Sequence, residues 1–332
     1  MNDKILFKNY FYKKDFGSAT IHLKNIILTE GEEKTKEYLS NLIKKEKPAI
    51  SVKTTRPIIG ITGSGGSTIK TFNVGTIASF IASGAGVVVV KTGTKKITGN
   101  FGTADVLSEL GVNIHLREEV IKKILKKINL AFIFSEDFCP WVGFYKYIKQ
   151  NIRDDQEIEK YINFVFLTRS SREINFSAKL NGIKIPQVKE RALCLKRAGL
   201  KKAIVVHGLS EKNDKFLDEF SVVGESIIAE LNKDKIKLYT LKPEDFGISR
   251  YKIKDIELQK QTIKNFAQLS MDILDNKFKN SPMENLALAN AALVIYLNKN
   301  KSLKGCFRDA KESLRSGKAI KKLYDLIKLS NF

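Results

Sequence analysis

The fold is decided by the stretch Pro57-Ile58-Ile59-Gly60-Ile61-Thr62-Gly63-Ser64-Gly65-Gly66-Ser67. Its first half predicts a short apolar strand, and its second half is a glycine-rich turn (residues 63–67) that leads into a helical pattern of small residues over 71–83. Glycines let the backbone approach a ligand closely and aim several N–H groups one way, and a helix start adds positive potential. The stretch therefore predicts an anion site, with an ordinary tight turn as the alternative. It matches neither the Walker phosphate loop nor the dinucleotide fingerprint.

Apolar runs of the same kind recur along the chain, and helical patterns separate them. The valine run over 87–90 is typical of a strand that is buried on both faces. Alternating strands and helices predict an α/β fold with a mostly parallel central sheet. The first 50 residues read as helical instead. We expect a small all-helical domain over residues 1–50 and a large α/β domain over 51–332 that includes the C-terminal helices. The remaining predicted elements are strands over 131–134 and 203–208 and helices over 105–110, 118–127, 284–297 and 302–329, the last broken near 316–317.

The composition limits the possible partners. The formal charge is +22, from 58 Lys and Arg against 36 Asp and Glu, which attracts polyanions such as nucleic acid or phosphorylated metabolites. A low-GC genome, whose codons favour lysine, isoleucine and asparagine, would produce the same charge. The three cysteines (Cys139, Cys194 and Cys306) form neither a disulfide framework nor a zinc pattern, which predicts a cytoplasmic protein. No apolar stretch is long enough to span a bilayer, so we expect no membrane partner.

Two more polar segments follow predicted strands. Lys91 opens a turn over 91–96, and a further turn covers 99–105. Ligands of parallel sheets bind beyond the carboxyl ends of the strands, so these turns and the glycine-rich turn are expected to share one crevice. Lys91 then favours a phosphate contact, with a solvated lysine as the alternative. The adjacent carboxylates Asp218 and Glu219 can hold Mg²⁺, with a surface acid pair as the alternative.

In this order, the segments resemble the anthranilate phosphoribosyltransferase family. That family has a Gly-Thr-Gly-Gly-Asp turn, an Asn-x-Ser-Thr helix start, a Lys-His-Gly-Asn turn, a Gly-Ser-Ala-Asp turn and a later Asp-Glu pair. The corresponding positions in this chain are 63–67, 73–76, 91–94, 102–105 and 218–219. The resemblance covers residues 58–329.

The resemblance implies a homodimer with a nucleoside-phosphorylase-like fold, and a cleft for phosphoribosyl diphosphate and Mg²⁺. A nitrogen nucleophile would displace the diphosphate at the sugar, and no side chain is assigned as a catalytic acid or base. Asp218 and Glu219 would ligate Mg²⁺. The residues assigned to phosphoribosyl diphosphate are Gly63, Ser64, Gly65, Gly66, Ser67, Asn73, Gly75, Thr76, Lys91, Thr94 and Thr103.

The chain departs from the family at several of these positions. Ser67, Gly75 and Thr94 stand where the family has Asp, Ser and Asn, and Lys149 stands where an arginine of the acceptor site would be. Lysine lacks the bidentate fork with which arginine holds a carboxylate. We therefore expect a divergent phosphoribosyltransferase whose nitrogen acceptor is not anthranilate, or which uses anthranilate weakly. The alternatives are a family member that binds nucleic acid through a basic surface, and a phosphorylase that cleaves a nucleoside or nucleotide.

Overall fold

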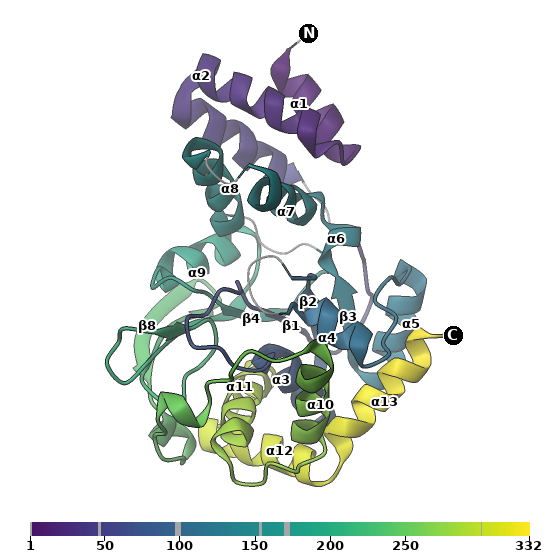
Figure 1. Cartoon of the computed structure of the whole chain (residues 1–332), viewed down its shortest axis with the longest axis vertical. Helices are drawn as coiled ribbons and strands as arrows, with labels where there is room; N and C mark the ends of the chain where they lie inside the picture. Colours follow the sequence, from purple (N-terminus) through teal and green to yellow (C-terminus); the bar gives the residue numbers. More distant parts are fainter. Residues whose placement is uncertain (1, 46–47, 97–100, 153–154, 169–172, 300) are drawn as a thin grey trace. The chain divides into compact units, whose positions relative to one another are not determined.

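The computed structural model describes residues 2–45, 48–96, 101–152, 155–168, 173–299 and 301–332 (Figure 1). The chain divides into two compact units. The helical unit comprises Met1–Ser51 and Ser135–Ile174, and the α/β unit comprises Val52–Phe134 and Asn175–Phe332. The predicted boundary near residue 50 had left 135–174 in the α/β domain, whereas the structure joins that segment to the N-terminal helices.

Aromatic packing explains why residues 135–174 belong to the helical unit. Phe7 and Phe11 of the N-terminal segment pack against Trp141 and Phe144, and all four side chains are at most 1% exposed. The Phe11 and Trp141 ring centroids lie 4.2 Å apart. Neither segment can bury these rings alone, so the apolar surface holds both together. The helices of this unit are α1 (Asp3–Tyr12), α2 (Phe16–Lys45), α6 (Ser135–Phe138), α7 (Pro140–Asn151) and α8 (Gln156–Thr168).

A single mixed sheet forms the centre of the α/β unit. Its strand order is β3-β2-β1-β4-β5-β7-β8, and β6 pairs with β5. The strands β3, β2, β1, β4 and β5 are parallel, while β7 and β8 continue the sheet antiparallel. The predicted α/β class with a mostly parallel sheet is confirmed. The strands are β1 (Ile58–Thr62), β2 (Val88–Gly93), β3 (Leu130–Phe134), β4 (Ala178–Gly182), β5 (Lys202–Leu209), β6 (Phe216–Leu217), β7 (Ser226–Asn232) and β8 (Lys235–Leu241).

Helices surround this sheet (Figure 1). Most residues of one of them, α11, are buried. Its small and apolar residues let it pack against α3 and α12 at once. The predicted break near 316–317 is confirmed, because Gly317 takes a left-handed φ of +72° between α12 and α13. The helices are α3 (Val74–Gly84), α4 (Thr103–Glu109), α5 (Glu118–Ile128), α9 (Val188–Arg197), α10 (Ile263–Leu274), α11 (Pro282–Asn298), α12 (Leu303–Arg315) and α13 (Lys318–Ser330), with 3₁₀ turns at Pro243–Phe246 and Ile253–Asp255.

None of the helices in the described part of the chain is long and apolar enough to cross a membrane. The three cysteines are free thiols, with Cys139 and Cys306 buried.

Candidate functional site

The glycine-rich turn follows β1, and its conformation depends on glycine. Gly65 and Gly66 have φ values of +67° and +85°, in the left-handed region that L side chains rarely adopt. A Cβ atom at Gly63 would lie 2.7 Å from Oδ2 of Asp218. The turn is therefore built for close approach of a negatively charged group to its backbone.

In this structure the negative group on the turn is the chain's own Asp218. The backbone N–H of Gly65 donates to Asp218 Oδ2 at 2.6 Å, and the Ser67 hydroxyl donates to Asp218 Oδ1 at 2.6 Å. The Ser64 hydroxyl makes a longer contact of 3.4 Å to Oδ2. The anion-site prediction for the turn thus agrees with its geometry, because its donors converge on a carboxylate. Which external ligand it takes stays a prediction.

The loop that carries Asp218 is tied to the turn through its backbone as well. The Asp218 N–H donates to Ser67 Oγ at 2.8 Å. Two residues earlier, the Phe216 N–H donates to Thr68 Oγ1 at 2.7 Å and the Thr68 N–H donates back to the Phe216 carbonyl at 3.0 Å. The loop therefore keeps its place on the turn without help from the Asp218 side chain.

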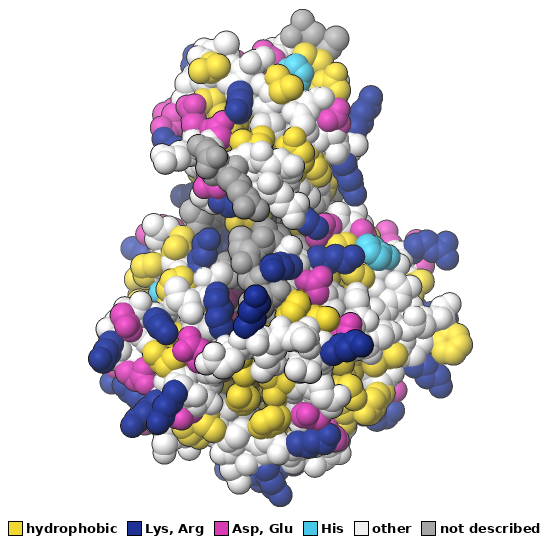
Figure 2. Space-filling view, viewed as in Figure 1, with side chains coloured by type: hydrophobic (Ala, Val, Ile, Leu, Met, Phe, Trp, Pro, Cys, Tyr) yellow, Lys and Arg dark blue, Asp and Glu magenta, His cyan; other side chains and the backbone are white. Residues whose placement is uncertain are grey.

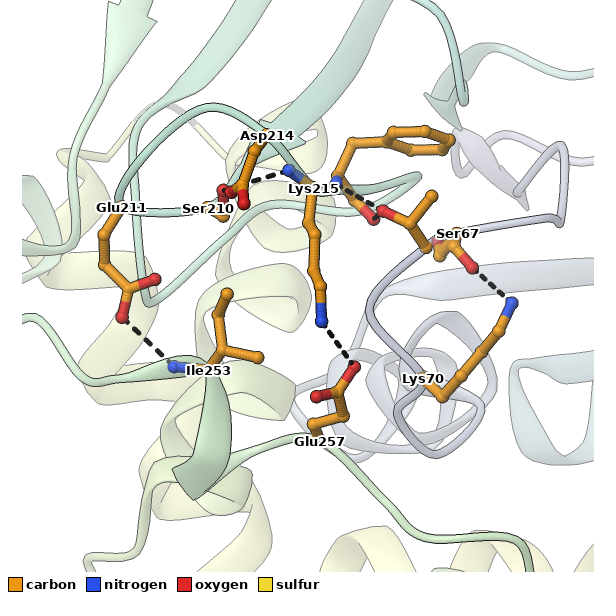
Figure 3. Close-up of polar contacts among 10 residues, drawn as sticks. Ser67, Lys70, Ser210, Glu211, Asp214, Lys215, Ile253 and Glu257 are labelled. Atoms are coloured by element: carbon orange, nitrogen blue, oxygen red, sulfur yellow. Dashed lines mark hydrogen bonds and ion pairs between the residues drawn. The ribbon is translucent and has the colours of Figure 1, made fainter.

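Two lysines make contacts nearby, one with the turn and one from the loop that carries Asp218 (Figure 3). The Lys70 ammonium donates to the Ser67 carbonyl, and the Lys215 ammonium lies 3.4 Å from Glu257 Oε1. Both cations therefore have partners within the protein.

Glu219 and Lys91 complete the polar cluster. Burial raises the pKa of Glu219 well above its usual range; the charge of Asp218 and a hydrogen bond with it act in the same direction, and Lys91 opposes them. Burial lowers the pKa of Lys91 to about 8, against the opposing pull of Glu219 and Asp218. Lys91 is only 6% exposed, and its ammonium donates to the Thr92 carbonyl at 2.7 Å. The solvated-lysine alternative is therefore wrong.

The carboxylate oxygens of Asp218 and Glu219 are ligands that suit magnesium. Two adjacent carboxyl groups face one buried lysine, and a divalent cation would favour the ionised form of both. Among the described residues, no three His, Cys, Asp or Glu side chains gather to form a metal cage. Mg²⁺ is usually held by one or two carboxylates, with waters and substrate phosphates filling its other positions.

A second group of predicted ligand residues lies at the starts of α3 and α4. The Thr76 hydroxyl donates to Thr103 Oγ1 at 3.3 Å, and the Ala104 N–H donates to the Thr94 carbonyl at 3.1 Å. The structure therefore brings the segments that contain Thr76, Thr94 and Thr103 together, although they are separate in sequence.

Asn73 and Gly75 connect this group to the cluster around Lys91. The Asn73 side-chain amide donates to the Gly102 carbonyl at 3.4 Å. A Cβ atom at Gly75 would lie 3.7 Å from Lys91 Cε, an ordinary van der Waals distance. Helix α3 begins at Val74 rather than at the predicted Thr71, so the helix start lies beside Lys91 and not directly behind the glycine-rich turn.

Lys149, the predicted acceptor residue, lies on α7 in the helical unit. Its ammonium is 2.6 Å from Glu159 Oε1 on α8 and lies 5.8 Å from the Tyr145 ring centroid. Its positive charge is thus already matched by a carboxylate. The acceptor role of Lys149 stays a prediction.

The structure adds one residue that the sequence did not suggest. The Lys184 N–H donates to Ser64 Oγ at 2.9 Å, and Lys184 Cδ lies 3.5 Å from where a Cβ of Gly66 would be. Lys184 is exposed and follows β4, a strand that the sequence pattern did not reveal. Recognising β4 would have placed Lys184 at the same sheet edge as the turn.

Comparison with known protein families covers most of the chain. The model of the glycosyl transferase family, a/b domain, matches residues 55–320. The chain belongs to this family. The anthranilate phosphoribosyltransferase of Petrotoga mobilis is 33% identical over 295 residues, covering 88% of this chain and 81% of that protein. The enzyme of the same name from Methanosphaera stadtmanae is 32% identical, covering 88% and 83%. The predicted resemblance is therefore confirmed.

Solved structures show the same fold. The anthranilate phosphoribosyltransferase (TrpD) from Thermus thermophilus superposes with a TM-score of 0.78 at 20% identity, covering 100% of this chain and 96% of that one. The Saccharomyces cerevisiae enzyme in complex with PRPP and Mg gives a TM-score of 0.71 at 21% identity, covering 95% and 85%. At this identity the likeness establishes the fold alone.

Proposed function

We propose that this chain is a phosphoribosyltransferase that transfers the phosphoribosyl group of phosphoribosyl diphosphate to a nitrogen acceptor with the help of Mg²⁺. The observation that carries the proposal is the convergence of the glycine-rich turn, buried Lys91 and the Asp218–Glu219 pair. Its curated relatives are named for this class of reaction, and a structural neighbour was solved with PRPP and Mg.

The proposed chemistry depends on handling charge. When the diphosphate leaves, negative charge builds up on its oxygens. Hydrogen-bond donors that are already positioned near those oxygens stabilise this charge and lower the barrier. Lys91 and, in the turn, the Gly65 N–H and the Ser67 hydroxyl are the fixed donors, and exposed Lys184 adds a cation beside them. Bound Mg²⁺ would act as a Lewis acid on the diphosphate oxygens, held by Asp218 and Glu219.

Residues around α3 and α4 are proposed to hold the remaining oxygens of the donor. Asn73, Thr76, Thr94 and Thr103 supply amide and hydroxyl groups close to Lys91. Gly75 lies beside Lys91, where an added Cβ would be 3.7 Å from Lys91 Cε. The attacking amine loses a proton once the new bond to the sugar carbon has formed, and the departing diphosphate can accept that proton, so we assign no side chain as a catalytic acid or base.

The acceptor half of the reaction is proposed to accept an amine. Anthranilate is the acceptor named for the curated relatives, so it is the first compound to test. Because Glu159 already neutralises Lys149, that lysine gives an acceptor carboxylate little net attraction. We accordingly propose slow turnover of anthranilate and faster turnover of an amine that lacks its carboxylate.

The direct test is diphosphate release from phosphoribosyl diphosphate in the presence of Mg²⁺ and a panel of aromatic and heterocyclic amines that includes anthranilate. We expect release that depends on both the acceptor and Mg²⁺. Absence of release across the panel, from protein that binds the donor, would overturn the proposed activity.

We also propose a homodimer, because apolar side chains are exposed on the helical unit. Ile5 on α1 is 54% exposed, and Ile21 and Leu28, seven residues apart on one face of α2, are 61% and 78% exposed. Sedimentation equilibrium should give twice the chain mass, and Leu28→Lys should shift the protein toward monomer. A monomeric wild type at micromolar concentration would contradict this.

Nucleic-acid binding stays a prediction from the charge of the chain. On the face drawn in Figure 2, Lys and Arg side chains are spread among acidic and apolar ones rather than gathered in one stripe. A titration with single-stranded DNA at several salt concentrations tests it, since phosphate contacts make affinity fall steeply with salt.

A further inference from the structure

The carboxylate of Asp218 occupies the donors that a phosphate would need. Its Oδ2 takes the Gly65 N–H at 2.6 Å, and its Oδ1 takes the Ser67 hydroxyl at 2.6 Å. Hydrogen bonds to an ionised acceptor are among the stronger ones in proteins. An incoming anion therefore meets a turn whose donors are already used, beside a negative charge that repels it.

We propose that Asp218 determines the specificity of the turn by closing it to anions that carry no metal, so that the site takes the metal complex of a diphosphate. This rests on the proposed function, because it assumes that the diphosphate binds at residues 63–67. A divalent cation attracts the Asp218 carboxylate toward Glu219 and away from the turn. Gly65 N–H and the Ser67 hydroxyl are then released for phosphate oxygens.

The backbone around Asp218 supports movement of the side chain alone. The loop is fixed by the Asp218 N–H bond to Ser67 Oγ and by the paired backbone of Phe216 and Thr68. Gly182 packs so closely on it that an added Cβ would lie 1.5 Å from the Asp218 carbonyl oxygen. Rotation of one side chain therefore opens the turn without moving the loop.

Glu219 differs from its neighbour in this respect. It interacts with Asp218 and Lys91, and within the described residues none of the hydrogen bonds from the turn ends on it. Asp218 both occupies the turn and is proposed to bind the metal, whereas Glu219 is proposed only to bind the metal. This difference supplies a matched pair of variants, Asp218→Asn and Glu219→Gln, which each replace one carboxyl group with an amide of the same size.

The experiment is isothermal titration of the full chain with pyrophosphate and with inorganic phosphate, in EDTA and in Mg²⁺. For wild type we expect pyrophosphate to bind at least about tenfold more tightly with Mg²⁺ than in EDTA, and inorganic phosphate to bind weakly in both. Asp218→Asn should bind pyrophosphate in EDTA about tenfold more tightly than wild type does, and should respond little to Mg²⁺. Glu219→Gln should lose the Mg²⁺ response and keep the weak binding of wild type in EDTA.

Two results would overturn the inference. One is equal affinity of wild type for pyrophosphate with and without Mg²⁺. The other is metal-free binding by Asp218→Asn that is no tighter than that of Glu219→Gln. Circular dichroism shows whether each variant is folded. If Asp218→Asn unfolds, Asp218→Ala replaces it, and its affinity for pyrophosphate in EDTA is also expected to be higher than that of wild type. The proposed function fails separately, if wild type shows Mg²⁺-dependent pyrophosphate binding but no acceptor transfers the phosphoribosyl group.

Discussion

The glycine-rich turn and the Lys149 pair each hold a charged contact of 2.6 Å, yet they are organised differently. At the turn, two adjacent carboxylates meet one buried lysine, and the groups come from three distant parts of the chain. At α7 and α8, one lysine meets one glutamate, and the helices beneath them share an aromatic core. The first region has one more carboxyl group than it has lysines, and hydrogen-bond donors that a ligand can use, whereas the second pairs one lysine with one glutamate and is structural.

The aromatic core of the helical unit should give the largest change in stability. Phe11→Ala removes a ring that is fully buried against Trp141, and should lower the free energy of unfolding by about 3–5 kcal/mol. Chemical denaturation measures this, with exposed Lys8→Ala on the same helix changing it by less than about 0.5 kcal/mol. Pyrophosphate affinity of the folded protein should stay the same, and a large loss of affinity would break the contrast between the two regions.

Lys91 should show the opposite behaviour, a loss of function without a loss of stability. Lys91→Met keeps the shape of the buried side chain but removes the charge, so kcat/KM for phosphoribosyl diphosphate should fall on the order of 10²–10³-fold. The free energy of unfolding should not fall, because burial already disfavours the charge there. Exposed Lys123→Met on α5 is the matched control. Unchanged kcat/KM in Lys91→Met would remove Lys91 from the donor site.

A third carboxylate at the turn should increase the demand for metal. Ser67→Asp replaces a hydroxyl that donates to Asp218 at 2.6 Å with a like charge. In EDTA this should lower stability by about 1–2 kcal/mol, and Mg²⁺ should restore more of it than in wild type. Thermal unfolding with and without Mg²⁺ measures both effects. If Mg²⁺ raised the unfolding temperature of Ser67→Asp and of wild type by the same amount, the result would contradict a metal site close to the turn.

The smallest effects belong to the Lys149 pair. Lys149→Gln should change the KM for a carboxylate-bearing acceptor by less than about twofold, because Glu159 already neutralises the lysine. Glu159→Gln frees that charge and should lower the same KM by roughly twofold to threefold. A tenfold rise of KM in Lys149→Gln would instead make Lys149 a direct acceptor contact.

The parallel part of the sheet could be predicted because its strands are simple in sequence. Runs such as 87–90 are apolar on both faces, which only a covered strand allows. Strand β4 was not predicted because it contains Lys179 and Asn181, polar residues that the sheet buries. The antiparallel strands β7 and β8 were not predicted because polar residues interrupt them. The longest apolar run in either is Ile227–Ala229, and β8 is largely exposed.

The candidate site was predictable as a set of segments but not as a set of contacts. The order of the turn, Lys91 and the Asp-Glu pair is readable along the chain, and parallel strands bring such segments to one sheet edge. The burial of Lys91 and the seating of Asp218 on Gly65 depend on packing between distant segments, which no local pattern reveals. The placement of 135–174 in the helical unit has the same cause, since aromatic rings far apart in sequence form its core.

The central claim is that the turn holds the diphosphate while metal joins it to the acidic pair. A crystal structure with phosphoribosyl diphosphate and Mn²⁺ in place of Mg²⁺ tests it most directly, because manganese can be located by its anomalous scattering. The account predicts manganese bound by Asp218 and Glu219, the diphosphate on residues 63–67, and the Asp218 carboxylate released from the Gly65 N–H. A bound diphosphate away from the turn, or one on the turn with Asp218 still hydrogen-bonded to Gly65, would contradict it.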